Sequence, residues 1–220
     1  MNTDTNGNGR PRKLHPAERK HEIPNAAGEL LLMHLVYRMT DGSKICPYQS
    51  RRQVGWVWHP SKTHCPQADD LLYGLPAFLE VKESAEVVYW TEGEKDADTA
   101  VAKAGVVAVA HHQGAVHSTL GQARWFEGYQ GTVIVVADVD IAGAADALRR
   151  YRLLARVGIP RERLRIVRPA EPYGLDGKDL TDHFDAGWSI DDLVEVNNRI
   201  NEVASLYIVN GGPRFGSGHD

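Results

Sequence analysis

The sequence predicts an α/β fold, in which a parallel sheet flanked by helices is preceded by a small β-rich module. Beyond about residue 80, short apolar segments alternate with segments of helical period, as in a succession of strand–helix units. The strand-like segments are apolar without alternation, as in Val-Ile-Val-Val at 133–136, which is typical of parallel strands covered on both faces. Before residue 80, shorter apolar runs are separated by turn signals.

The N-terminal elements are predicted from composition and turn chemistry. Residues 1–28 are rich in Asn, Gly, Pro and charge, so we expect a flexible tail there. Residues 29–80 carry short apolar runs around the turn Thr-Asp-Gly-Ser at 40–43, which favours a hairpin, and they form the predicted β-rich module. A second flexible tail is expected over residues 206–220.

The second domain, residues 81–205, is predicted from its periodicity. Four strands, joined by helices that allow them to run parallel, are expected over 86–91, 106–110, 132–137 and 163–168. Helices are expected over 95–104, 142–157 and 189–203, the last one closing the domain.

Composition limits the location and the partners of the protein. The net charge is −4, which argues against a surface coated in basic residues but allows a local basic face. The sequence has only 2 cysteines and no apolar run resembling a signal peptide or a membrane span. We therefore expect a cytoplasmic protein, with no disulfide and no membrane partner.

Acidic residues follow two of the predicted strands. Glu92 follows strand 86–91, and Asp138 and Asp140 follow strand 132–137. Because the carboxyl ends of parallel strands meet at one edge of a sheet, these carboxylates should converge there, and their repulsion calls for a hard divalent cation such as Mg²⁺ or Mn²⁺. The alternative is that the acids cap helices or lie solvated in turns.

Gly143 stands at the start of the helix expected over 142–157. It lets the first turn begin without a side chain in the way. The free N–H groups of a helix N-terminus there would suit a phosphate.

Four segments occur in a fixed order: VVYWTEGEKDADTAVAKAG, VVAVAHHQGA, TVIVVADVDIAGAADALRR and GKDLTDHF. Together they resemble the TOPRIM domain of bacterial and phage primases and primase–helicases, over about residues 86–187. The resemblance implies that Glu92 is a metal ligand or a general acid–base group and that Asp138 and Asp140 are metal ligands, these three being catalytic. It also implies that Asp96 and Asp179 are supporting acids near the metals.

The same resemblance suggests three glycines that shape the loops of the site, Gly93, Gly114 and Gly143. Lys95 and Lys178, within the matching motifs, are expected to bind phosphate.

Template and primer would also need a cationic surface. Arg149, Arg152 and Arg156 share one face of the helix expected over 142–157, where they could hold a nucleic-acid backbone or form an ordinary solvated face. Trp56 and Trp58 would share one face of a strand, where they could stack on bases or pack in the core.

A zinc site is a poor alternative. Four candidate ligands lie within twenty residues, but they form no CxxC pair and two of them are adjacent in sequence: Cys46, His59, His64 and Cys65.

The function expected from the resemblance is that of a primase-like nucleotidyl transferase. It would use Mg²⁺ or Mn²⁺ to join nucleoside triphosphates into short primers on single-stranded DNA. It would do so during replication of a phage or mobile element in a bacterial host cell, beside a replicative helicase supplied in trans. No P-loop motif occurs, so no helicase motor of that kind is expected within the sequence. A metal-dependent nuclease and a non-catalytic, nucleic-acid-binding replication accessory protein stay open as alternatives.

Overall fold

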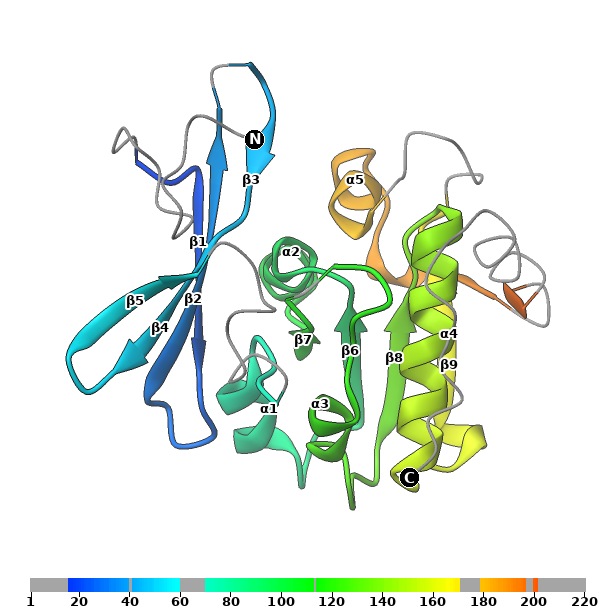
Figure 1. Cartoon of the computed structure of the whole chain (residues 1–220). Helices are drawn as coiled ribbons and strands as arrows, with labels where there is room; N and C mark the ends of the chain where they lie inside the picture. The colour runs from blue at the N-terminus through cyan, green and yellow to red at the C-terminus, as the bar shows by residue number, and fades with distance from the viewer. Residues whose placement is uncertain are drawn as a thin grey trace.

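The computed structural model describes residues 16–39, 41–59, 70–112, 114–170, 179–196 and 200–201. An antiparallel sheet from the first part of the chain lies beside a largely parallel sheet flanked by helices (Figure 1). This confirms the predicted α/β fold with a preceding β-rich module. In the described residues, no helix is both long enough and apolar enough to cross a bilayer.

The first sheet has the strand order β1-β2-β4-β5, and its pairings are antiparallel. A short strand, β3, pairs with the end of β2 across the predicted turn, where Gly42 adopts a positive φ of 82°. The strands are β1 (Arg19–Pro24), β2 (Leu30–Arg38), β3 (Lys44–Ile45), β4 (Tyr48–Arg52) and β5 (Gly55–His59).

Strand β1 lies inside residues 1–28, for which the sequence predicted a flexible tail. The structure corrects this for residues 19–24, which pair with β2. His21 and Ile23 are buried while their neighbours are not, so β1 has one apolar face that the overall composition of the segment concealed.

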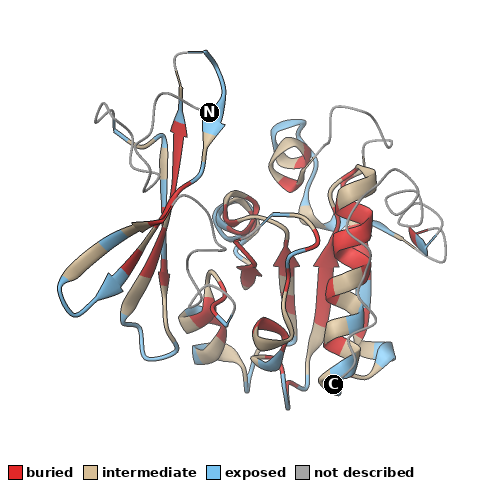
Figure 2. Cartoon of the chain, in the orientation of Figure 1, coloured by how far each residue is buried: buried red, intermediate tan, exposed pale blue. Residues whose placement is uncertain are grey.

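The second sheet has the order β10-β9-β8-β6-β7, and it is parallel except at β10. Its two faces are both apolar: Val133 and Val135 belong to one core cluster, Ile134 and Val136 to the other, as the uninterrupted apolar run predicted (Figure 2). The strands are β6 (Val87–Thr91), β7 (Ala108–Ala110), β8 (Thr132–Val136), β9 (Leu164–Arg168) and β10 (Val194–Glu195).

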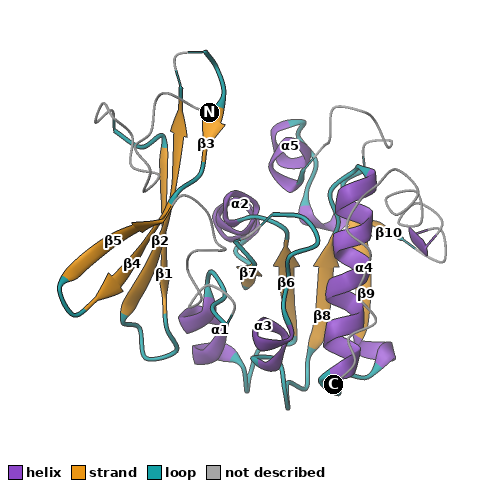
Figure 3. Ribbon diagram, viewed as in Figure 1, coloured by secondary structure: helices purple, strands orange, loops and turns teal. Residues whose placement is uncertain are grey.

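Helices cover both faces of this sheet (Figure 3). One face carries α1 (Leu75–Val81), α3 (Leu120–Arg124) and α4 (Ile141–Arg156), and the other carries α2 (Glu94–Ala104) and α5 (Leu180–Asp185). Helix α1 falls within residues 29–80, assigned above to the β-rich module, yet its Leu75 and Phe78 pack in the core of the second sheet. The division of the chain into domains stays a prediction.

The prediction of a helix over residues 189–203 is wrong for residues 189–196. Residues 190–192 form a single 3-10 turn, capped by Ser189, and β10 follows antiparallel to β9. Val196 donates its backbone N–H to the Ile166 carbonyl at 2.8 Å, and Glu195 pairs with Arg165 at 2.6 Å. The edge of β9 would otherwise be open, and it supplies hydrogen-bond partners for the backbone of β10. This pairing outweighs the helical pattern of the segment, which includes β-branched valines that favour a strand.

Candidate functional site

A cavity of about 190 Å³ lies beyond the carboxyl ends of β6 and β8. Residues from both sheets line it: His34, Glu92, Gly93, Glu94, Asp96, His111, His112, Gly114 and Asp138. This is the edge where a parallel sheet places its ligands.

Glu92 reaches the cavity because it follows the last residue of β6. Its Oε2 atom is buried and has no hydrogen-bond partner among the described residues. Burial raises the pKa of Glu92 to about 8, the negative charges of Asp146, Asp140 and Asp96 add to this, and Arg150 opposes it. In the absence of a cation, Glu92 is therefore mostly protonated at neutral pH.

Asp138 follows β8 and faces the same cavity. Burial and the nearby charges of Glu92, Asp96 and Asp179 raise its pKa well above the usual value. A Cβ atom placed on Gly143 would lie 2.6 Å from the Cβ of Asp138 and 2.7 Å from its carbonyl oxygen. The absence of a side chain at Gly143 therefore allows the first turn of α4 to pack directly against Asp138.

Asp96 comes from the first turn of α2 and is buried. Its Oδ1 accepts hydrogen bonds from the Thr181 backbone N–H at 2.9 Å and from the Thr181 hydroxyl at 2.7 Å. Burial and the charge of Asp179 raise the pKa of Asp96 to about 6. Asp96 therefore borders the cavity and also ties α2 to the start of α5.

Asp140 and Asp179 are N-caps, the role named above as the alternative for these acids. Asp140 Oδ1 accepts the Gly143 N–H at 2.6 Å, and Asp179 Oδ1 accepts the Asp182 N–H at 2.9 Å. Asp179 also forms an ion pair with Lys95. Neither acid lines the cavity, although the charge of Asp140 raises the pKa of Glu92 and that of Asp179 raises the pKa of Asp138.

The geometry bears on metal binding in two ways. Across the described parts of the chain, no group of three or more His, Cys, Asp or Glu side chains is already placed to hold a metal ion. Glu92 and Asp138 nevertheless share one cavity, and the buried, unpartnered oxygen of Glu92 suits a hard cation that would offset the crowded negative charge. The donor set fits a cation held by few protein ligands and several waters, as Mg²⁺ often is.

The predicted basic face is only partly exposed. Arg149 donates its Nε–H to the Ser118 carbonyl at 2.8 Å and is half-buried, whereas Arg152 and Arg156 are exposed on α4. Lys95 is engaged with Asp179. Lys178 lies outside the described residues.

Sequence reasoning did not identify His34 of β2, which lines the cavity from the first sheet. Its Nδ1 lies 2.6 Å from Glu94 Oε1, and its ring stacks on Tyr48 with centroids 4.4 Å apart. The Tyr48 hydroxyl donates to the carbonyl of His112. His34 and Glu94 are 60 positions apart, so no local pattern could have paired them.

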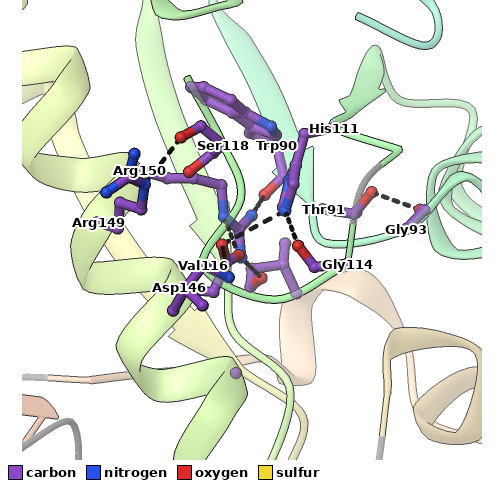
Figure 4. A network of polar contacts seen from close by, with 12 residues as sticks. Trp90, Thr91, Gly93, His111, Gly114, Val116, Ser118, Asp146, Arg149 and Arg150 are labelled. Atoms are coloured by element: carbon purple, nitrogen blue, oxygen red, sulfur yellow. Dashed lines mark hydrogen bonds and ion pairs between the residues drawn. The ribbon is translucent and has the colours of Figure 1, made fainter. Parts of the chain in front are cut away.

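A buried polar network under the cavity was also missed (Figure 4). Asp146 and Arg150 of α4 are both fully buried and form an ion pair at 2.7 Å. Asp146 Oδ1 also lies 3.3 Å from His111 Nε2 and accepts the Val116 N–H at 2.8 Å. The one signal in the sequence was an acid and a base four residues apart in an alanine-rich helix.

Of the remaining candidates, those that the structure describes do not line the cavity. His59 is buried and hydrogen-bonded to Ser50 at 2.7 Å, Cys46 is exposed, and both His64 and Cys65 lie outside the described residues. Trp56 is partly buried, with the Arg51 guanidinium 5.9 Å from its ring centroid.

Comparisons with known proteins place the fold. No family model matches the chain, and no curated protein matches it in sequence. A solved structure of the DnaG catalytic core aligns at a TM-score of 0.55 and 17% identity, covering 86% of this chain and 55% of that one. The zinc-binding and RNA polymerase domains of the Aquifex aeolicus primase align at 0.54 and 17% identity, covering 90% of this chain and 48% of theirs.

A third structure, the DnaG primase catalytic domain bound to single-stranded DNA, aligns at 0.55 and 17% identity, covering 80% of this chain and 53% of that one. The chain spans about half the length of these solved structures. Its second sheet therefore has the fold of a bacterial primase-type TOPRIM domain, and an antiparallel β-rich sheet precedes it in this chain.

Proposed function

We propose that the chain is a primase-like, metal-dependent nucleotidyl transferase that makes short primers on a single-stranded DNA template during phage or mobile-element replication, beside a replicative helicase. The observation that carries the proposal is the convergence of Glu92 and Asp138, from the ends of two adjacent parallel strands, on one cavity. The primase-type fold supports the same reaction class.

Glu92 and Asp138 would hold Mg²⁺ or Mn²⁺, with Asp96, Asp140 and Asp179 supplying further negative charge around them. When bound, the cation withdraws charge from the phosphates of a nucleoside triphosphate. Two of the supporting acids would keep their capping bonds, so they hold α4 and α5 in place while they contribute charge.

The reaction joins the 3′ oxygen of the primer to the α-phosphorus of the incoming nucleotide and releases pyrophosphate. The proton of the 3′-hydroxyl has to leave, and a carboxylate with a pKa near the working pH is suited to take it. Glu92, whose pKa burial brings to about 8 in the cation-free site, would fill either this role or that of a ligand to the cation, and not both at once. Exposed Arg152 and Arg156 would hold the phosphate backbone without reading its sequence.

The test is to incubate the protein with single-stranded DNA, labelled ribonucleotides or deoxyribonucleotides, and Mg²⁺ or Mn²⁺. New short oligomers are expected from the wild type, and Asp138→Asn or Glu92→Gln should reduce their yield by about 100-fold or more while the fold persists. Arg163→Lys, at the opposite end of the sheet, is the control for an ordinary substitution.

Shortened DNA in place of new oligomers would identify a nuclease that uses the same acids to activate water. The absence of both products, or full activity in both acid variants, would overturn the proposal and leave the accessory role.

A further inference from the structure

Arg150 is a charged side chain in the middle of the core. Its exposed fraction is 0%, and it lies between α4 and the sheet. Burying a guanidinium is unfavourable unless its donors are satisfied by well-placed partners, and an apolar side chain would fill the same volume without that cost. The partners of Arg150 therefore indicate what it does.

Those partners are at the ends of two neighbouring strands. One terminal nitrogen donates to the carbonyl of Trp90 in β6, and the other donates to the carbonyl of Val136 in β8 at 2.9 Å (Figure 4). Glu92 stands two residues after Trp90, and Asp138 stands two residues after Val136. One planar group thus connects the backbone just before each of the two acids.

Asp146, one turn earlier on α4, forms an ion pair with Arg150 at 2.7 Å from its Nε, but these two atoms do not meet hydrogen-bond geometry, so Asp146 supplies charge rather than a directed bond. Asp146 also holds the chain that follows β7, through the Val116 N–H and His111. Strand ends β6 and β8 and the segment around residue 116 are therefore connected to one rigid point on α4.

We propose that Arg150 is a positioning residue that sets the separation and direction of Glu92 and Asp138, so that the two carboxylates can share a divalent cation. The inference rests on the proposed function, because it assumes that these acids bind that cation. Arg150 does not line the cavity, so it positions the acids through the strand ends, and its charge also opposes the rise in the pKa of Glu92 and Asp138.

The alternative is that Arg150 only stabilises the fold. The two roles differ in cation affinity, because a residue that only stabilises would change the melting temperature and leave the affinity of the folded protein unchanged. Partners that orient metal ligands typically change metal affinity by about 10- to 100-fold when they are replaced.

The experiment measures Mn²⁺ affinity by electron paramagnetic resonance, together with thermal unfolding, for the wild type and for Arg150→Lys. Lysine keeps the charge but cannot present the planar pair of donors to two carbonyls. We expect the folded variant to bind Mn²⁺ about 10-fold more weakly. Arg163→Lys, whose arginine bonds only Gln130 among the contacts described for it, should bind like the wild type.

A folded Arg150→Lys variant with Mn²⁺ affinity within about twofold of the wild type would overturn the positioning role while leaving the proposed function intact. Failure of the wild type itself to bind Mn²⁺ would overturn both. If Arg150→Lys does not fold, Asp146→Asn decides, since it removes the anion paired with Arg150 at nearly constant volume. Loss of that charge alone would ease ionisation of Glu92 and strengthen Mn²⁺ binding, so weaker binding supports the inference, and unchanged or stronger binding overturns it.

Discussion

Glu92 lowers the stability of the fold when it is ionised, because it is a buried carboxyl whose neighbours are also acidic. Its pKa is about 8 in the folded chain and near 4.5 when unfolded. The contribution of Glu92 to stability is therefore fully present below pH 4.5 and is lost as the pH rises through 8. The glutamine in Glu92→Gln does not titrate. We therefore expect the free energy of unfolding of the variant to exceed that of the wild type by about 2 kcal/mol at pH 8.5 and by little at pH 5.

Urea unfolding of both proteins across this pH range, without divalent cations, measures the difference. Adding Mn²⁺ should then stabilise the wild type more than Glu92→Gln, because the variant has lost one of the two proposed carboxylate ligands. A wild type that is the more stable protein at pH 8.5 in the absence of metal would contradict this account of Glu92.

The sequence was sufficient to place Glu92 and Asp138 at one cavity, because each follows a predicted buried strand and strand ends converge, while their role as metal ligands stays a prediction. It could not separate these acids from Asp140 and Asp179, because a metal ligand and a helix cap call for the same residue type at the same place. His34 could not be found at all, since its contact with Glu94 exists only after two sheets have packed.

At the scale of the element, the start of α4 depends on Gly143. In an ordinary helix, glycine to alanine would gain about 1 kcal/mol. Here the added methyl would lie 2.6 Å from the Cβ of Asp138, and overpacking of that kind costs about 1–3 kcal/mol. We expect Gly143→Ala to lose about 1–2 kcal/mol of unfolding free energy and to weaken Mn²⁺ binding, because Asp138 must move.

Gly93→Ala is the matched control for that change. Its added Cβ would meet only Asp96 Oδ2, at 3.9 Å, and its φ of −126° suits any residue. We expect Gly93→Ala to lose less than about 1 kcal/mol of unfolding free energy, because alanine is a poorer N-cap than glycine. Equal stability of Gly143→Ala and the wild type in chemical denaturation would show that the start of α4 can shift away from Asp138.

The elements differ in how far local pattern determines them. Helices α2 and α4 and the four parallel strands were predicted close to their observed bounds, because their apolar periodicity and their burial agree. Residues 189–196 were not, since Ser189 and Asp192 form a capping box that begins a turn while the edge of β9 captures Val194 and Glu195 as a strand. The pairing partner of β10 lies nearly thirty residues earlier, beyond the reach of a local pattern.

At the scale of the whole molecule, the first sheet contacts the second domain beside the cavity, at α2 and at the segment after β7. His34 and His21 of the first sheet face Glu94 and Asp98 of α2, at 2.6 and 3.4 Å. Tyr48 contributes a further bond, to the carbonyl of His112. Since His34 and Glu94 both line the cavity, the docking of the β-rich module and the shape of the site are coupled.

The ion pair between His34 and Glu94 gives this coupling a measurable pH dependence. Burial alone would lower the pKa of His34, but hydrogen bonds with Cys46 and Glu94 raise it from 6.5 to about 9. Burial would likewise raise the pKa of Glu94, but His34 lowers it to about 2. The stability contributed by His34 is therefore fully present below pH 6.5 and is lost as the pH rises through 9.

His34→Gln keeps a hydrogen-bonding group and removes the charge. We expect it to be less stable than the wild type by about 2 kcal/mol at pH 6 and to approach the wild type at pH 9.5, as measured by denaturant unfolding. Glu94→Gln should show no additional loss when combined with His34→Gln, because each change already breaks the same pair. The contradicting outcome is a difference in unfolding free energy between His34→Gln and the wild type that stays constant from pH 6 to 9.5. It would mean that the charged pair does not join the two sheets.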